Sequence, residues 1–130
     1  MAGIFARIAN GEIPSYKIAE TENCFAFLDL KPLAKGHTLI IPKQEIDYIF
    51  DLPPELYIEL HTFSQTIAKA IFKAIPCKKI GMAVIGLEVP HAHIHLVPMQ
   101  TMHDLNFSNS RLEFSDVEYK DIAKLIQAKL

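Results

Sequence analysis

The chain has 130 residues, 50% of them hydrophobic and 22% charged, with 13 basic and 15 acidic side chains and a formal net charge of −2. This composition is typical of one soluble globular domain, and a chain of this length buries enough surface to fold without disulfides or metal ions. Its basic residues occur in runs no longer than Lys78-Lys79, which disfavours nucleic-acid binding, and no apolar stretch approaches the roughly 20 residues that cross a bilayer.

The N-terminus and the cysteines predict a location. The first residues lack the basic leader, apolar core and small-residue cleavage site of a secretory signal, so we expect a cytoplasmic protein. Cys24 and Cys77 lie far apart without Cys-x-x-Cys spacing, and a reducing compartment keeps such residues as thiols. We therefore expect two buried small hydrophobic residues rather than a disulfide.

In the first part of the chain, a short helix and three short strands are predicted. Apolar residues repeat at helical spacing from Ile4 to Ile8, and Asn10-Gly11 offers a left-handed stop before Pro14. Three extended runs bounded by turn residues follow, which predicts an antiparallel meander over residues 16–19, 24–28 and 38–41.

The rest of the chain predicts one long helix, two strands and a last helix. Apolar residues keep three-and-four spacing from Leu56 to Ala74, directly after Pro53-Pro54. Strands are expected over residues 80–85 and 92–97, and a capping box at residues 115–118 starts the last helix after a polar stretch. This order predicts an α+β fold with an antiparallel sheet of about five strands, one long helix on one face and short terminal helices gathered on that same face. We expect a single domain over residues 1–130, with a variable C-terminal tail from about residue 99.

Half of the six histidines lie in one motif, His-Ala-His-Ile-His, at residues 91–95. On a strand, alternate side chains share a face at about 6.6 Å spacing, so the three imidazoles are expected on one face and the apolar residues between them on the other. The apolar side is expected to pack against the long helix. The imidazole side then faces solvent or a ligand cavity, as an antiparallel sheet permits.

Three imidazoles on one surface allow three interpretations. They are ordinary solvated histidines, a zinc site with three histidine ligands and one open position, or a nucleophilic centre. In the last case a neutral imidazole attacks an electrophile while its neighbours stabilise the charge that develops, and phosphorus is the natural target. The residue pattern alone leaves all three open.

The motif at residues 91–95, followed by Leu96-Val97, resembles the His-x-His-x-His pattern with apolar x of the histidine triad (HIT) family of nucleotide hydrolases and transferases. Further matching segments lie at residues 4–14, 26–30, 36–43 and 86–90, so the resemblance covers most of the first hundred residues. Within the family, the chain resembles the Hint-like purine nucleoside phosphoramidase branch. The tail after Pro98 carries no such resemblance.

The resemblance implies a role for each histidine of the cluster. His93 would attack the α-phosphorus of a nucleotide and carry the nucleotidyl group, while His95 would bind the phosphate and assist the leaving group. His91 and the separate His37 would orient the nucleophile and complete the polar cluster. Without the resemblance, His37 would be an ordinary hydrogen-bonding residue at the start of a strand.

The resemblance also implies a nucleoside site. Asp29 would bind the ribose hydroxyls, although a carboxylate at this position also suits a turn cap. The base would pack on the apolar residues Phe5, Ile8, Leu28 and Leu30, of which the first two equally suit a helix core. Glu88 would contact the leaving group or cap a turn.

The implied activity is hydrolysis of a nucleoside phosphoramidate or related nucleotide through a covalent nucleotidyl-histidine, which releases a nucleoside monophosphate. No metal or other cofactor is expected, the base is expected to be a purine, and the chain is expected to form a homodimer. A dinucleoside polyphosphate hydrolase is an alternative, as is a nucleotide-binding or metal-binding regulatory protein of low activity.

The sequence departs from the family pattern just before the motif. The segment 83–85 lacks the Asn that many members carry there, and Leu87 stands where a Gln is expected. Two polar contacts to the phosphate or leaving group would then be absent. This departure affects rate and substrate preference more than the role of His93, because catalysis depends on transition-state donors beyond the nucleophile.

Overall fold

The computed structural model describes residues 2–130. In chain order its elements are α1 (Ile4–Ala9), β1 (Lys17–Glu20), β2 (Cys24–Leu28), β3 (Thr38–Pro42), the 3₁₀ helix η1 (Ile49–Asp51), α2 (Pro54–Ala74), β4 (Lys79–Ala83), β5 (Ile94–Met99) and α3 (Asp116–Gln127).

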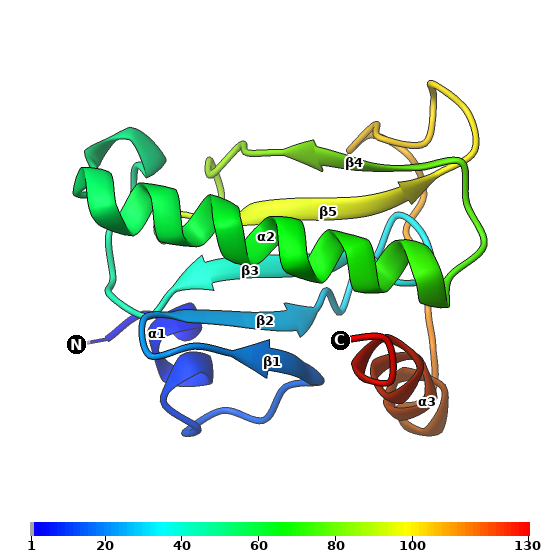
Figure 1. Ribbon diagram of the computed structural model, residues 1–130, viewed down its shortest axis with the longest axis horizontal. Helices are drawn as coiled ribbons and strands as arrows, with labels where there is room; N and C mark the ends of the chain where they lie inside the picture. Colours follow the sequence, from blue (N-terminus) through cyan, green and yellow to red (C-terminus); the bar gives the residue numbers. More distant parts are fainter. Residues whose placement is uncertain (1) are drawn as a thin grey trace.

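The strands form a five-stranded antiparallel sheet in the order β1-β2-β3-β5-β4 (Figure 1). The last strand of the sequence lies between β3 and β4, so it is flanked on both sides. His95 pairs with Leu39 of β3 and with Ala83 of β4. The predicted α+β fold class is confirmed.

The main core lies between the sheet and α2, which crosses one face of it in Figure 1. Alternate residues of the central strands point toward α2, and they include Ala26, Leu28, Ile40, Ile94 and Leu96. The residues between them form a second cluster on the other face, where Phe5 and Ile8 of α1 cover Phe25, Phe27, Leu39 and Ile41.

The expectation that the helices gather on one face is therefore wrong for α1. Every residue of β2 and β3 is buried, because both strands carry apolar side chains on both faces. Such strands need cover on both sides, and α1 supplies part of it on the face opposite α2.

The last two strands differ from their predicted bounds. β4 ends at Ala83 rather than residue 85, and β5 begins at Ile94 rather than residue 92. Just before β5, the backbone forms hydrogen bonds outside the sheet. The His91 N–H donates to the Val89 carbonyl at 2.8 Å, and the Ala92 N–H donates to the Ile46 carbonyl at 2.7 Å. Two of the three histidines of the motif thus precede the strand.

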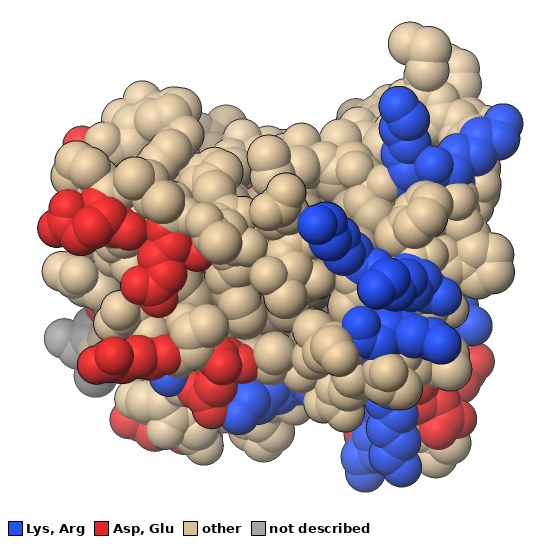
Figure 2. Space-filling view, in the orientation of Figure 1, with Lys and Arg blue, Asp and Glu red and all other residues tan. Residues whose placement is uncertain are grey.

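The ends of the long helix and the last helix suit their dipoles. The predicted capping box is confirmed: the Ser115 hydroxyl accepts the Glu118 N–H at 3.1 Å, and the Glu118 carboxylate accepts the Ser115 N–H at 2.8 Å. Figure 2 shows acidic side chains over the N-terminal part of α2 and basic ones over its C-terminal part. In α3 the first turn carries Asp116 and Glu118 and the last turn carries Lys124. This arrangement is favourable, because a helix attracts negative charge at its N-terminus and positive charge at its C-terminus.

Cys24 is buried and Cys77 half-buried, and both are free thiols as expected. Among residues 2–130, no helix combines the length and apolar character that crossing a membrane requires.

Candidate active site

Four histidines meet on the face of the sheet opposite α2. His37 directly precedes β3, His95 is the second residue of the neighbouring β5, and their rings lie 5.3 Å apart. The His93 ring lies 4.9 Å from that of His95, and Phe5 contacts the rings of both His93 and His91. The expected cluster is therefore present, but it is covered: the exposed fractions of His91, His93 and His95 are 1%, 6% and 8%.

Gly36 places His37 at the start of β3. Its φ of +93° is a left-handed conformation that glycine adopts without strain, and a Cβ there would lie 3.1 Å from Ile75 Cγ1. The residue before His37 thus needs both the backbone freedom and the small size of glycine.

Hydrogen-bond partners define which nitrogen of His37 and of His95 carries the proton. The Leu33 N–H donates to His37 Nδ1 at 2.9 Å, so this nitrogen offers its lone pair and the proton lies on Nε2. His37 Nε2 in turn lies 3.0 Å from His95 Nδ1 and donates to it. The neutral His95 ring therefore carries its own proton on Nε2.

The opposite arrangement holds for His93. Its Nδ1 lies 2.7 Å from the carbonyl oxygen of His91, which only accepts, so Nδ1 carries a proton and the neutral ring has its lone pair on Nε2. His91 Nε2 donates to the Pro42 carbonyl at 2.8 Å, and its buried Nδ1 has no hydrogen-bond partner within the described chain. The two adjacent neutral imidazoles are therefore opposite tautomers. His93 Nε2 can act as a nucleophile or base, and His95 Nε2–H can act as a hydrogen-bond donor.

Burial disfavours the charged form of His37, His91 and His95. It lowers the pKa of His37 to about 3 and that of His95 to about 4, and it also lowers the pKa of His91. Repulsion from neighbouring histidines in their protonated form acts in the same direction. At neutral pH these three imidazoles are neutral, as the hydrogen bonds accepted by His37 Nδ1 and His95 Nδ1 require for those two rings.

Asp29 joins the cluster at the end of β2. One carboxylate oxygen accepts the Lys31 N–H at 2.8 Å and the other lies 3.5 Å from His37 Nε2. Burial raises the pKa of this carboxyl. The predicted ribose-binding residue thus lies beside the histidines, and it also caps a turn.

The side chains of Asp29, His37 and His95 offer ligand atoms within 4.8 Å of one another, which is close enough for a metal ion. Coordination through His37 Nε2 would require the ring proton to move to Nδ1, where the Leu33 N–H already points. The hydrogen-bond pattern therefore opposes metal binding by this set.

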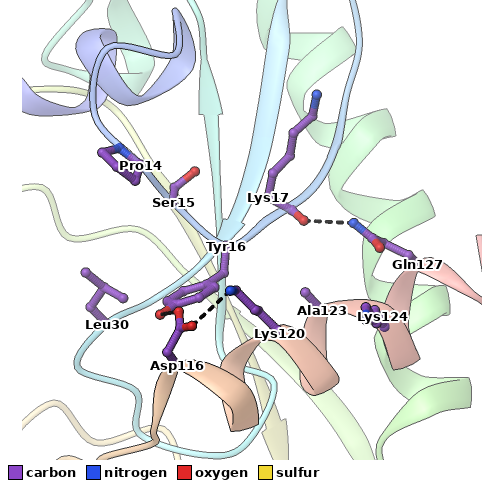
Figure 3. Close-up of a pocket in the computed structure, with 10 residues that line it drawn as sticks. All are labelled: Pro14, Ser15, Tyr16, Lys17, Leu30, Asp116, Lys120, Ala123, Lys124 and Gln127. Carbon is purple, nitrogen blue, oxygen red and sulfur yellow. Dashed lines mark hydrogen bonds and ion pairs between the residues drawn. The ribbon is translucent and has the colours of Figure 1, made fainter.

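The residues expected to hold the base lie in three different places. Phe5 and Ile8 lie on the histidine face, with the Phe5 and His93 rings 5.1 Å apart. Leu28 points to the opposite face and packs in the main core. Leu30 is 63% exposed and lines a pocket of about 600 Å³ between residues 14–17 and α3 (Figure 3).

The segment before the histidines is open to solvent. Glu88 is exposed, and Leu87, at the position where the resemblance predicts a Gln, is 89% exposed.

Two tail residues at the site were missed by the sequence analysis. The Phe107 ring lies 4.7 Å from that of His95 and 6.4 Å from that of His37, and Arg111 stacks on Phe107. Neither residue belongs to a periodic hydrophobic pattern. The sequence indicated their place only through the position of the tail, which directly follows the strand that carries His95.

The chain is similar in sequence to known proteins. The HIT domain model matches residues 10–102. The adenosine 5'-monophosphoramidase HNT1 of Saccharomyces cerevisiae is 38% identical over 98 residues, which are 75% of this chain but only 62% of that protein. The adenylylsulfatase HINT3 of Arabidopsis thaliana is 30% identical over 95% of this chain and 65% of its own length. This chain thus spans less than two thirds of either relative.

Solved structures extend the likeness over nearly the whole chain. A Hit-like protein of Bartonella henselae, described as involved in cell-cycle regulation, superposes with a TM-score of 0.86 at 31% identity, covering 98% of this chain and 96% of that one. The chain belongs to the HIT domain family.

Proposed function

We propose that this protein is a nucleotide hydrolase that cleaves the α-phosphorus bond of a nucleoside phosphoramidate or related nucleotide through a covalent intermediate on His93. The observation that carries the proposal is the pair of opposed tautomers, an unprotonated His93 Nε2 beside a protonated His95 Nε2. Relatives named adenosine 5'-monophosphoramidase and adenylylsulfatase support a nucleotide substrate and a hydrolytic reaction.

In the first step, the lone pair of His93 Nε2 forms a bond to the α-phosphorus and the bond to the leaving group breaks. The leaving group departs with the electron pair and takes its proton from solvent, while His95 Nε2–H hydrogen-bonds to it or to a phosphate oxygen. The His93 ring becomes positively charged, and its Nδ1–H is already held by the His91 carbonyl, which stabilises that charge.

In the second step, water attacks the phosphorus on the face that the leaving group vacated. The phosphorus–nitrogen bond breaks and returns its electron pair to His93, the water proton passes to solvent, and a nucleoside monophosphate is released. His37 acts indirectly: by donating to His95 Nδ1 it keeps the His95 proton on Nε2. His91 fixes the His93 ring.

The nucleoside lies between α1 and the end of β2 in this proposal. Asp29 accepts hydrogen bonds from the ribose hydroxyls, and Phe5 and Ile8 contact a purine base. Leu30 lines the pocket of Figure 3, and in this proposal the base site extends from Phe5 and Ile8 toward that pocket. Leu28 supports the position of Asp29 from the core rather than touching the base. Glu88, on the exposed segment before the histidines, contacts the leaving group.

The test is release of AMP from adenosine 5'-phosphoramidate by chelator-treated protein, compared between wild type, His93→Ala and the control His103→Ala in the exposed tail. We expect turnover in wild type and in the control, and a loss of at least a thousandfold in His93→Ala. A quenched wild-type reaction should contain adenylyl-His93. Turnover that persists in His93→Ala would refute the mechanism.

A second candidate is a nucleotide-binding protein of low activity, which the exposed Leu87 favours because it supplies no polar contact at that position. AMP binding to wild type without measurable turnover would select this candidate.

We also propose that residues 1–130 act as one cytoplasmic domain that forms a homodimer. β4 is an edge strand of the sheet, and the apolar side chains of Met82 on β4 and Phe72 on α2 are exposed. A symmetric partner would cover both features. Light scattering after gel filtration should give twice the chain mass of 14.7 kDa, and a monomeric mass would refute the proposed homodimer.

A further inference from the structure

The side chain of Arg111 is held in a fixed position by the tail and by the turn after β2. Its Nη1 donates to the Lys31 carbonyl at 2.8 Å, its Nη2 donates to the Phe107 carbonyl at 3.3 Å, and its guanidinium carbon lies 5.4 Å from the centre of the Phe107 ring. The neighbouring Leu112 N–H donates to the Pro32 carbonyl at 2.9 Å, which fastens the same segment of tail. Although Arg111 is exposed, it is ordered by contacts from two segments.

These contacts place the guanidinium at the edge of the histidine cluster. The guanidinium stacks on Phe107, whose ring contacts the His95 ring edge-on. It also donates to the carbonyl of Lys31, and the N–H of Lys31 donates to the Asp29 carboxylate. The charge of Arg111 adds to the effect of burial in lowering the pKa of His37 and of His95. Arg111 thus adds a permanent positive charge beside His37 and His95, whose charged forms burial disfavours.

This charge forms no ion pair in the described chain, although from a longer distance it counteracts the burial that raises the pKa of Asp29. No carboxylate oxygen of residues 2–130 lies within ion-pair distance of Arg111, whereas the only other arginine, Arg7, pairs with Glu12 at 3.1 Å. Two of the five N–H donors of the guanidinium are used on carbonyls, which leaves three. An arginine fixed by neutral groups beside a phosphate-reacting site is suited to bind an anion, because its planar donors match phosphate and sulfate oxygens.

Resting on the proposed function, we propose that Arg111 binds a second anionic group of the substrate, a phosphate or sulfate beyond the α-phosphate. The preferred substrates are then nucleotides that carry this group on the leaving side or on the ribose, rather than nucleotides with a neutral amine leaving group alone. Such a contact would also supply a polar donor in a site where Leu87 provides none.

Calorimetric titration at low ionic strength tests this with three ligands that the enzyme does not cleave. AMP carries the α-phosphate only, α,β-methylene-ADP adds a phosphate on the leaving side through an uncleavable P–C bond, and adenosine 3',5'-bisphosphate adds one on the ribose. Wild type is compared with Arg111→Gln and with the matched control Arg7→Gln, which removes a paired arginine.

We expect at least one of the two doubly anionic ligands to bind wild type and Arg7→Gln about tenfold more tightly than AMP does. In Arg111→Gln this gain should disappear while AMP binding changes less than twofold, which also shows that the site is intact. The gain should fall as salt is added. Which of the two ligands shows the gain identifies the position of the anionic group.

The proposal is overturned if neither ligand binds wild type more tightly than AMP, or if the gain persists in Arg111→Gln. It is also overturned if Arg111→Gln weakens all three ligands equally, because Arg111 would then only hold the tail in place. If AMP fails to bind wild type and adenosine 5'-phosphoramidate is not turned over, the proposed nucleotide hydrolase falls and this inference falls with it, and that result is distinct from the others.

Discussion

Acid should destabilise this protein well above the pH at which carboxylates titrate, because its folded state buries neutral histidines. Burial lowers the pKa of His37 to about 3 and of His95 to about 4, whereas an unfolded chain has histidine pKa values near ~6.5. Between these limits the unfolded state binds more protons than the folded state. The stabilisation is therefore complete above about pH 7 and is lost progressively as the pH falls through the window from 6.5 to about 3.

The size of the effect follows from the number of protons. Each extra proton bound by the unfolded state changes the free energy of unfolding by about 1.4 kcal/mol per pH unit. With two such histidines, the free energy of unfolding should fall by on the order of 2.5 kcal/mol between pH 6 and pH 5. This is a large part of the roughly 5–15 kcal/mol that stabilises an ordinary domain. His91, whose pKa burial also lowers, acts in the same direction, and Asp29, whose pKa burial raises, acts in the opposite one.

Urea denaturation at pH 7, 6 and 5, at one protein concentration, measures this dependence. The variant is His37→Asn, whose side-chain oxygen can accept the Leu33 N–H in place of Nδ1. We expect it to reduce the slope between pH 6 and 5 by about half, whereas His103→Asn, in the exposed tail, should keep the wild-type slope. A wild-type loss below about 0.7 kcal/mol over this pH unit, or an unchanged slope in His37→Asn, would refute the reasoning.

Three further predictions concern stability and the site. Phe5→Ala should lower the free energy of unfolding by about 3 kcal/mol in urea and weaken AMP binding, because the ring is buried against Phe27 and His93. Gly36→Ala should cost roughly 1–2 kcal/mol and lower turnover of adenosine 5'-phosphoramidate, because alanine is strained at a φ of +93° and would displace the start of β3. Ser115→Ala should cost about 1 kcal/mol through loss of the cap and leave turnover unchanged, and a change in kcat would contradict this.

Element types and their order could be predicted because burial repeats with the period of each element. Buried residues of α2 recur every three or four positions, and the capping box of α3 depends only on residues within one turn. The ends of β5 could not be predicted in this way. Its start depends on the Ala92 N–H bonding to Ile46, a residue almost fifty positions away, and no local pattern reports that contact.

The faces of the sheet were harder to predict than its strands. When every residue of a strand is apolar, as in β2, alternation disappears and the sequence does not distinguish the side that meets α2 from the side that meets α1. The order of the elements placed α1 beside α2, and the family resemblance grouped Leu28 with Phe5; no alternation in β2 was available to correct either prediction, although the two side chains lie on opposite faces. Phe107 and Arg111 escaped prediction for the related reason that the tail has no period at all.

Residue types predicted that the histidines would cluster, but not which of them can attack. An imidazole nitrogen donates or accepts according to its partner, and here the partners are backbone groups of separate segments: the Leu33 N–H beside His37 and the His91 carbonyl beside His93. In the neutral His93 ring, a carbonyl bonded to Nδ1–H leaves the lone pair on Nε2, and in the proposed mechanism it would stabilise the cation formed by a bond from Nε2 to phosphorus. His95 accepts at Nδ1 instead, so its Nε2 already carries a proton and cannot attack while the ring is neutral. The division of labour between two adjacent histidines therefore follows from the fold of the surrounding loops.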